Sequence, residues 1–167
     1  MDELFFLPSA PVAMPRAYWV DHFFLSSQVI VITPSEKEWR RVEYAIDHHE
    51  EGEFDMDILN KLYGKSCAVI PHRKFDLLSG EFHSNKHEPY LGQPNEKWDA
   101  RKILAETKYV HFSDWPMPKP WLEPLEGMSE KFRPACRNMT TTEKDCSDRD
   151  VWLELRSNFT ERRQVSY

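Results

Sequence analysis

The clearest apolar run in the chain covers residues 29–32, Val-Ile-Val-Ile, and is closed by Pro34. An unbroken run of β-branched residues is typical of a strand that is buried on both faces of a sheet. Directly after this run, Ser35 and Glu38 have the spacing of a helix N-cap and its capping box, and apolar residues recur at a helical period as far as His48. The pattern therefore predicts a buried strand followed by an amphipathic helix.

Similar patterns continue along the chain. Residues 54–63 predict a helix that ends at Gly64, with two aspartates in its first turn, where the helix dipole favours negative charge. The remaining predictions are strands at 67–70 and 109–112 and helices at 99–106 and 148–163. Residues 1–18 contain three prolines and predict irregular chain with one helical turn at 2–6, and three prolines within 115–121 predict a shaped loop. Strands that alternate with helices predict an α/β fold.

Composition and charge argue against several classes of function. The chain has 167 residues, enough for one ordinary domain, and its net charge of −6 disfavours nucleic acid as a partner. No apolar run approaches the roughly 20 residues of a membrane span, and the first residues lack the pattern of a signal peptide. Cys67 lies in an apolar run and is predicted to be buried, whereas Cys136 and Cys146 lie in a polar segment where they can pair.

Two carboxylates, Asp55 and Asp57, form the first candidate site. Carboxylates two residues apart can chelate a divalent cation that is bound to a nucleotide diphosphate. A metal motif of this kind normally ends a hydrophobic strand, but here the pair opens a helix. The competing interpretation is that Asp55 caps the helix and Asp57 faces solvent.

Two further candidates flank the proline-rich loop. His111 ends the predicted strand 109–112, and strand ends line ligand crevices in α/β folds, so this imidazole can bind a metal. Lys119 is the only cation on the loop and lies between Trp115 and Trp121. A cation held by rigid neighbours can stabilise the charge that develops on a leaving diphosphate. The competing interpretations are a structural histidine and a surface lysine.

The order of three segments resembles the glycogenin-type family eight glycosyltransferases. These segments read SSQVIVITPS at 26–35, DMDILN at 55–60, and VHF at 110–112 followed by KPW at 119–121. The family patterns are N-S-G-V-F-V-Y-Q-P-S, D-Q-G-I-L-N and H-F-x-G-x-x-K-P-W. The resemblance is closest to the fungal Golgi branch, described as N-acetylglucosaminyltransferases. This chain departs from the patterns at positions 26, 28, 56 and 57 and in a longer loop without glycine.

The resemblance implies a retaining enzyme of the GT-A fold that moves a sugar, first of all N-acetylglucosamine, from a UDP-sugar to a glycan with the help of Mn²⁺. By position, His111 corresponds to the metal-binding histidine and Lys119 to the diphosphate-binding lysine. Asp55 corresponds to the aspartate near the anomeric carbon, where it either attacks that carbon or stabilises the oxocarbenium-like state. The residues that contact donor or acceptor are Ser26, Ser27, Lys119 and Trp121.

The same resemblance implies a partial GT-A domain, because in the family the metal-binding D-x-D motif lies just before the segment that matches residues 2–5. We therefore expect residues 1–121 to form the C-terminal part of the transferase domain, 122–147 a polar linker and 148–167 a helix. The expected sheet is mixed and lacks its nucleotide-binding strands, and the expected compartment is the Golgi or, without an anchor, the cytoplasm. Two alternatives to an enzyme stay open: a non-catalytic remnant or interaction module, and a carbohydrate-binding module that uses Trp115 and Trp121 for stacking.

Overall fold

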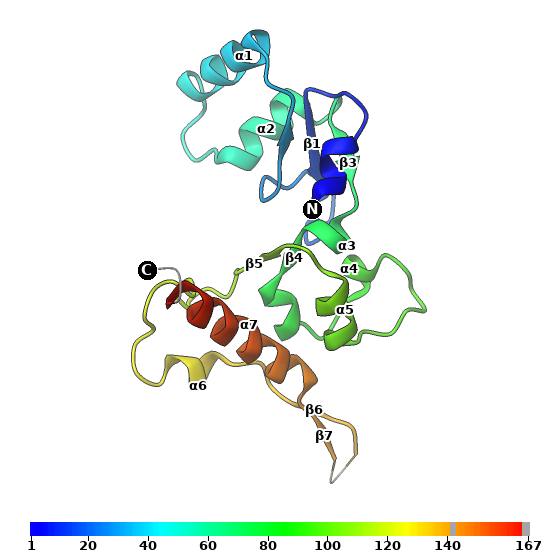
Figure 1. Cartoon of the computed structure of the whole chain (residues 1–167), viewed down its shortest axis with the longest axis vertical. Coiled ribbons are helices and arrows are strands. Elements are labelled where there is room, and N and C mark those ends of the chain that lie inside the picture. Colours follow the sequence, from blue (N-terminus) through cyan, green and yellow to red (C-terminus); the bar gives the residue numbers. More distant parts are fainter. Residues whose placement is uncertain (141–142, 165–167) are drawn as a thin grey trace. The chain divides into compact units, whose positions relative to one another are not determined.

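The structure, a computed structural model, describes residues 1–140 and 143–164 and consists of two compact units, Met1–Asp76 and Leu77–Tyr167. Each unit has its own helices and strands (Figure 1). The first unit contains, in chain order, the 3₁₀ helix η1 (Asp2–Phe6), β1 (Val12–Pro15), β2 (Val31–Ile32), α1 (Glu36–Asp47), α2 (Asp55–Tyr63), β3 (Ala68–Ile70) and α3 (His72–Phe75).

A three-stranded mixed sheet, in the order β2-β1-β3, forms the centre of the first unit. β1 pairs antiparallel with β2 and parallel with β3, so that Ala13 lies opposite both Val31 and Ala68. The prediction of irregular chain at 1–18 is wrong for β1, which is the central strand. Pro11 precedes the strand and Pro15 ends it, and a missing N–H at these positions removes little of the ladder.

The predicted buried strand at 29–32 is shorter and more exposed than its composition suggests. Only Val31 and Ile32 pair in the sheet, and Ile32 is exposed because β2 is an edge strand. The helix after it is confirmed as α1, and the Glu38 backbone N–H donates to the Ser35 hydroxyl at 3.3 Å. The core of the unit is a cluster of buried residues with partly buried neighbours packed against it: Val12, Met14, Leu25 and Tyr63, with Ile30, Val42, Leu59, Leu62 and Cys67.

The second unit is mainly helical. Its elements are β4 (Leu77–Leu78), the 3₁₀ helix η2 (Ser79–His83), α4 (Glu88–Leu91), α5 (Ala100–Glu106), β5 (Val110–His111), α6 (Met128–Phe132), β6 (Arg137–Asn138), β7 (Lys144–Asp145) and α7 (Ser147–Gln164). β4 and β5 form a parallel pair, and β6 and β7 an antiparallel pair. The chain is thus a mixed α/β protein with small sheets, while the GT-A architecture stays a prediction.

Helix α7 is the largest element of the second unit and packs against α5 and η2. Its residues Val151 and Trp152 are fully buried. A disulfide between Cys136 and Cys146 joins the start of the β6–β7 segment to the start of α7. The helix predicted at 148–163 is therefore confirmed, and it belongs to the core of this unit.

Candidate functional site

The residues singled out from the sequence fall into two groups, one in each unit. Ser26, Ser27 and Asp55 belong to the first unit, and His111, Lys119 and Trp121 to the second.

In the first unit, Asp55 is the first residue of α2 and is exposed to solvent. Its carboxylate accepts a hydrogen bond of 2.5 Å from the Ser27 hydroxyl. Asp57, and not Asp55, caps the helix, because the Phe54 backbone N–H donates to the Asp57 carboxylate at 3.0 Å. Asp57 thus has a structural role, and the Asp55 carboxylate is tied to Ser27.

The Asn60 side chain fixes the serine segment against α2. Its amide oxygen accepts from the Leu25 N–H at 2.8 Å, and its amide nitrogen donates to the Leu25 carbonyl, also at 2.8 Å. These two bonds mimic a pair of strand bonds and hold the backbone immediately before Ser26. Asn60 belongs to the DMDILN segment at 55–60, and its role in holding the serine segment is visible only in the folded unit.

Ser26 and Asp76 form a buried polar pair in the same unit. Both are fully buried, and the Ser26 hydroxyl accepts from the Gln28 N–H at 3.2 Å. Burial raises the pKa of Asp76 to about 7, and the nearby Ser26 hydroxyl opposes only part of this shift. Within the described residues, neither Asp76 oxygen has a hydrogen-bond partner of normal geometry. No sequence pattern pointed to Asp76, since its burial arises only in the folded unit.

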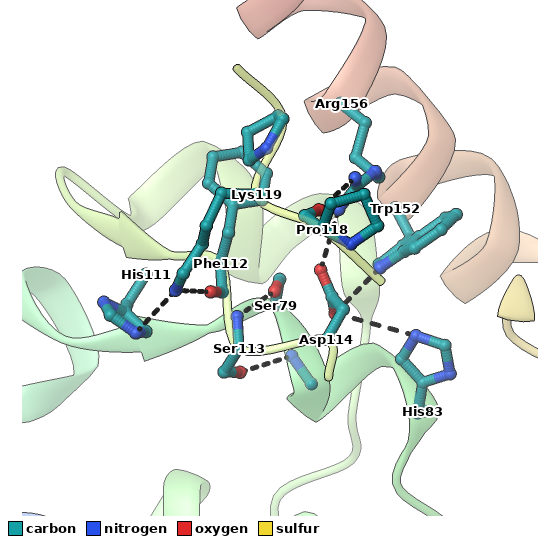
Figure 2. Close-up of polar contacts among 12 residues, drawn as sticks. Ser79, His83, His111, Phe112, Ser113, Asp114, Pro118, Lys119, Trp152 and Arg156 are labelled. Carbon is teal, nitrogen blue, oxygen red and sulfur yellow. Dashed lines mark hydrogen bonds and ion pairs between the residues drawn. The ribbon is translucent and has the colours of Figure 1, made fainter. Parts of the chain in front are cut away.

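In the second unit, the structure brings His111 and Lys119 together (Figure 2). The Lys119 ammonium lies 3.3 Å from His111 Nε2 and donates a hydrogen bond to the Phe112 carbonyl. Because an ammonium can only donate, His111 Nε2 is the acceptor and the ring proton is on Nδ1. Burial, together with the charge of Lys119, lowers the pKa of His111, so the imidazole is neutral at neutral pH.

The loop that carries Lys119 is anchored by a buried carboxylate, Asp114 (Figure 2). Its Oδ1 accepts from Trp152 Nε1 at 3.0 Å, and its Oδ2 lies 3.3 Å from Arg156 Nη1. His83 Nε2 lies 3.7 Å from Oδ1. The Asp114 side chain is 3% exposed and that of Arg156 is 11% exposed, so the ion pair is shielded from water.

Helix α7 also donates hydrogen bonds to carbonyl groups of the loop. Arg156 Nη2 donates to the Pro118 carbonyl at 2.7 Å, and Arg163 donates to the Trp121 carbonyl at 2.8 Å. Thr160 reaches the Pro120 carbonyl at 3.4 Å. Prolines remove donors from the loop but leave its carbonyls, and one face of α7 satisfies them.

The other side of the loop is tied to η2 (Figure 2). The Ser113 N–H donates to the Ser79 hydroxyl at 2.9 Å, and the Gly80 N–H donates to the Ser113 hydroxyl at 3.0 Å. A side chain at position 80 would come within 3.0 Å of the Ser113 oxygen, so glycine suits this approach. The Lys119 ammonium therefore stands on a loop that is fixed from two sides.

The described residues do not bring together a full set of ligands for the expected manganese ion. Among residues 1–140 and 143–164, no group of three or more His, Cys, Asp or Glu side chains gathers where it can hold a metal ion. His111 is one candidate ligand, and its Nε2 lone pair already accepts from Lys119. One neutral imidazole does not make a binding site for a hard cation that prefers several oxygen ligands. We therefore derive no chemical step through a metal.

Comparison with known proteins identifies several relatives, all named glucose N-acetyltransferase 1. The protein from Aspergillus fumigatus is 44% identical over 179 residues, which cover 99% of this chain and 47% of that protein. The protein from Gibberella zeae is 43% identical over 169 residues, covering 98% of this chain and 37% of that protein. The protein from Debaryomyces hansenii is 28% identical over 82% of this chain. No protein-family model matches, and no solved structure is similar.

The chain spans less than half the length of these relatives. Their shared name describes transferases, which supports the coarse prediction that this chain derives from a transferase family. Across the described part of the chain, no helix is both long enough and apolar enough to cross a membrane.

Proposed function

We propose that this chain contributes to a glycosyltransferase that moves a sugar from a UDP-sugar to a glycan. The sugar proposed is N-acetylglucosamine. The observation that carries the proposal is the placement of Lys119. Its ammonium has three donors, of which one goes to the Phe112 carbonyl and one faces His111 Nε2. The third is available for a phosphate oxygen.

Because its loop is fixed, the Lys119 ammonium is suited to stabilise negative charge on a bound diphosphate. A donor that is already in place when negative charge develops on a leaving diphosphate stabilises it without reorganisation. The bonds that hold the loop come from α7 and η2, that is, from the chain itself, and this is the condition for such preorganisation. Because His111 is neutral, its Nε2 accepts from the Lys119 ammonium without repelling it.

Asp55 is the proposed carboxylate at the sugar carbon. It is exposed, and the Ser27 hydroxyl orients one of its oxygens. Either of two roles fits a carboxylate in this state: attack on the anomeric carbon, or stabilisation of an oxocarbenium-like transition state. Mn²⁺ as cofactor and the Golgi as compartment are further parts of the proposal, and both derive from the family resemblance.

The relatives' name adds support for sugar chemistry, because it joins glucose with an N-acetyl group. It also suggests a second reaction, the transfer of an acetyl group alone. Mass spectrometry of the acceptor after incubation with UDP-N-acetylglucosamine together with an acetyl thioester separates the two. A gain of one N-acetylhexosamine residue supports the proposal, and a gain of one acetyl group contradicts it.

Donor binding is the decisive test for this chain. Isothermal titration calorimetry with UDP-N-acetylglucosamine should give a measurable affinity for the wild type. The variant Lys119→Met should bind about 10–100-fold more weakly, as expected for a lost hydrogen bond between charged groups.

A matched control is Lys102→Met, which removes an exposed lysine of α5 in the same unit. Its affinity for the UDP-sugar should stay within about twofold of wild type, because exposed ion pairs contribute little. The proposal is wrong if the wild type does not bind, or if both lysine variants lose the same affinity.

A further inference from the structure

A groove lies between the loop after Lys119 and helix α7, in the second unit. Its volume is about 550 Å³, and its walls are formed by residues of the 120–124 segment, Ser129, and the α7 residues between Trp152 and Arg163. Pockets of roughly 300–1,000 Å³ accommodate ligands of drug size, a range that includes a short oligosaccharide.

The groove has an ordered aromatic platform. The Trp121 side chain is 48% exposed, while its ring contacts Phe159 with ring centres 5.9 Å apart. Its carbonyl is fixed by the 2.8 Å hydrogen bond from Arg163. One part of the indole is therefore held in place and the other part is open, as stacking of a ligand ring requires.

The walls combine apolar and polar groups in a way that matches a sugar. Leu122 and Pro124 line the groove on the loop side, whereas Ser157, Glu161 and Arg163 line it from α7. A pyranose ring has C–H groups on its faces, which pack on an indole, and hydroxyl groups at its edge, which bond to carboxylate, guanidinium and hydroxyl groups. Ser157 already donates to Glu161 at 2.8 Å and Arg163 to the Trp121 carbonyl, so these groups are oriented along the groove and keep further donors and acceptors for a ligand.

The groove also lies close in the chain to the proposed donor site. Trp121 follows Lys119 by two residues, so at most about 7 Å of backbone separates the two positions. A saccharide held on Trp121 is therefore near the place where Lys119 would hold the diphosphate.

We propose that this groove binds the saccharide acceptor, with Trp121 as its stacking platform and Glu161 and Arg163 as polar contacts. The proposal deepens the proposed transferase function, on which it rests for the role of the bound saccharide.

The test uses linear trisaccharides of glucose, mannose and N-acetylglucosamine, titrated calorimetrically into the 167-residue chain. At least one should bind, and Trp121→Ala should weaken that binding by about tenfold or more. The matched control is Trp115→Ala, because Trp115 is 91% exposed on the same loop but does not line the groove. This control should leave the affinity within about twofold of wild type.

Glu161→Ala is a second variant that keeps the proposal testable if Trp121→Ala unfolds, since Glu161 is an exposed residue of α7. It should also weaken saccharide binding while the thermal unfolding curve stays close to that of wild type. Three results would overturn the proposal: no trisaccharide binds, Trp115→Ala loses as much affinity as Trp121→Ala, or Trp121→Ala changes only the oligomeric state in sedimentation.

The two proposals fail in distinguishable ways. Binding of UDP-N-acetylglucosamine that depends on Lys119, without any saccharide binding, would contradict the groove and leave the donor site intact. Saccharide binding that depends on Trp121, without donor binding, would contradict the transferase and favour a carbohydrate-binding module.

Discussion

Each unit contains a buried carboxylate, and the two differ in whether their oxygens have hydrogen-bond or ion-pair partners. Asp114 in the second unit is 3% exposed and has Trp152, Arg156 and His83 within reach of its oxygens. Asp76 in the first unit is fully buried, yet neither oxygen has a partner of normal geometry among the described residues. One site compensates the cost of burial, and the other does not.

The difference shows how each unit holds its candidate residues. In the second unit the compensated carboxylate fixes the loop of Lys119, so stability and the position of the cation depend on the same contacts. In the first unit Asp55 is exposed and bonded to Ser27, while the buried Asp76 lies beside Ser26. The buried carboxylate thus holds the position of the candidate cation in the second unit, whereas in the first unit the candidate carboxylate is held by an exposed contact.

The largest effect on stability is expected when Arg156, the cationic partner of Asp114, is removed. Arg156→Met leaves Asp114 buried without its cation, and breaking a buried pair in this way costs about 3–5 kcal/mol of folding free energy. Hydrogen exchange monitored by mass spectrometry should show faster exchange in α7 and in the loop at 113–121. Binding of the UDP-sugar should fall as well, because Lys119 loses its support.

Arg101→Met is the matched control for this change. Arg101 and Glu154 are also 3.3 Å apart, but their side chains are 63% and 48% exposed. Removal of an exposed pair costs about 0–1 kcal/mol. Equal exchange rates in the two variants would show that Asp114 does not anchor the loop.

The next largest effect concerns Asp76 and pH. Its pKa of about 7 in the folded unit lies above the ordinary value of 3.8, so the folded state binds the proton more tightly than the unfolded chain. Stability of the first unit should be highest at acid pH and fall as pH rises through 7. The loss between pH 5 and pH 8 is on the order of 2–3 kcal/mol.

Urea unfolding at several pH values, followed by exchange of the amides of residues 1–76, measures this dependence. Asp76→Asn has no titrating group at this position and should flatten the curve. A wild-type stability that rises from pH 5 to pH 8 and is unaffected by Asp76→Asn would contradict the assignment of an uncompensated carboxylate.

The smallest effect is expected at Ser27. Ser27→Ala removes the hydrogen bond to Asp55, and because both groups are close to solvent the cost is at most about 0.5–1.5 kcal/mol. The thermal midpoint should fall by only a few degrees, as expected for a change of this size. A loss as large as that of Arg156→Met would mean that this contact supports the fold of the first unit.

Local signals in the sequence were sufficient for several elements. Ser35 capped its helix as expected because an N-cap depends on atoms three residues away. β1 was missed because prolines at both ends concealed a strand whose partners, β2 and β3, lie about 20 and 55 residues further along. The length of β2 was overestimated because a β-branched run does not reveal that its strand lies at a sheet edge.

The candidate site shows the same difference between contacts that are short in sequence and contacts that are long. His111 and Lys119 were singled out from the sequence, and the structure places Lys119 Nζ 3.3 Å from His111 Nε2, since only eight residues separate them. The anchors of their loop were not found, because Trp152 and Arg156 lie about 40 residues away from Asp114 in the sequence. No sequence motif marked Asp76, since its raised pKa follows from burial in the folded unit.

The most direct measurement is a crystal structure of this chain with UDP-N-acetylglucosamine. We expect a diphosphate oxygen to lie within hydrogen-bond distance of Lys119 Nζ, with the loop still held by Asp114 and Arg156. A bound UDP-sugar whose diphosphate lies away from Lys119 would contradict this expectation.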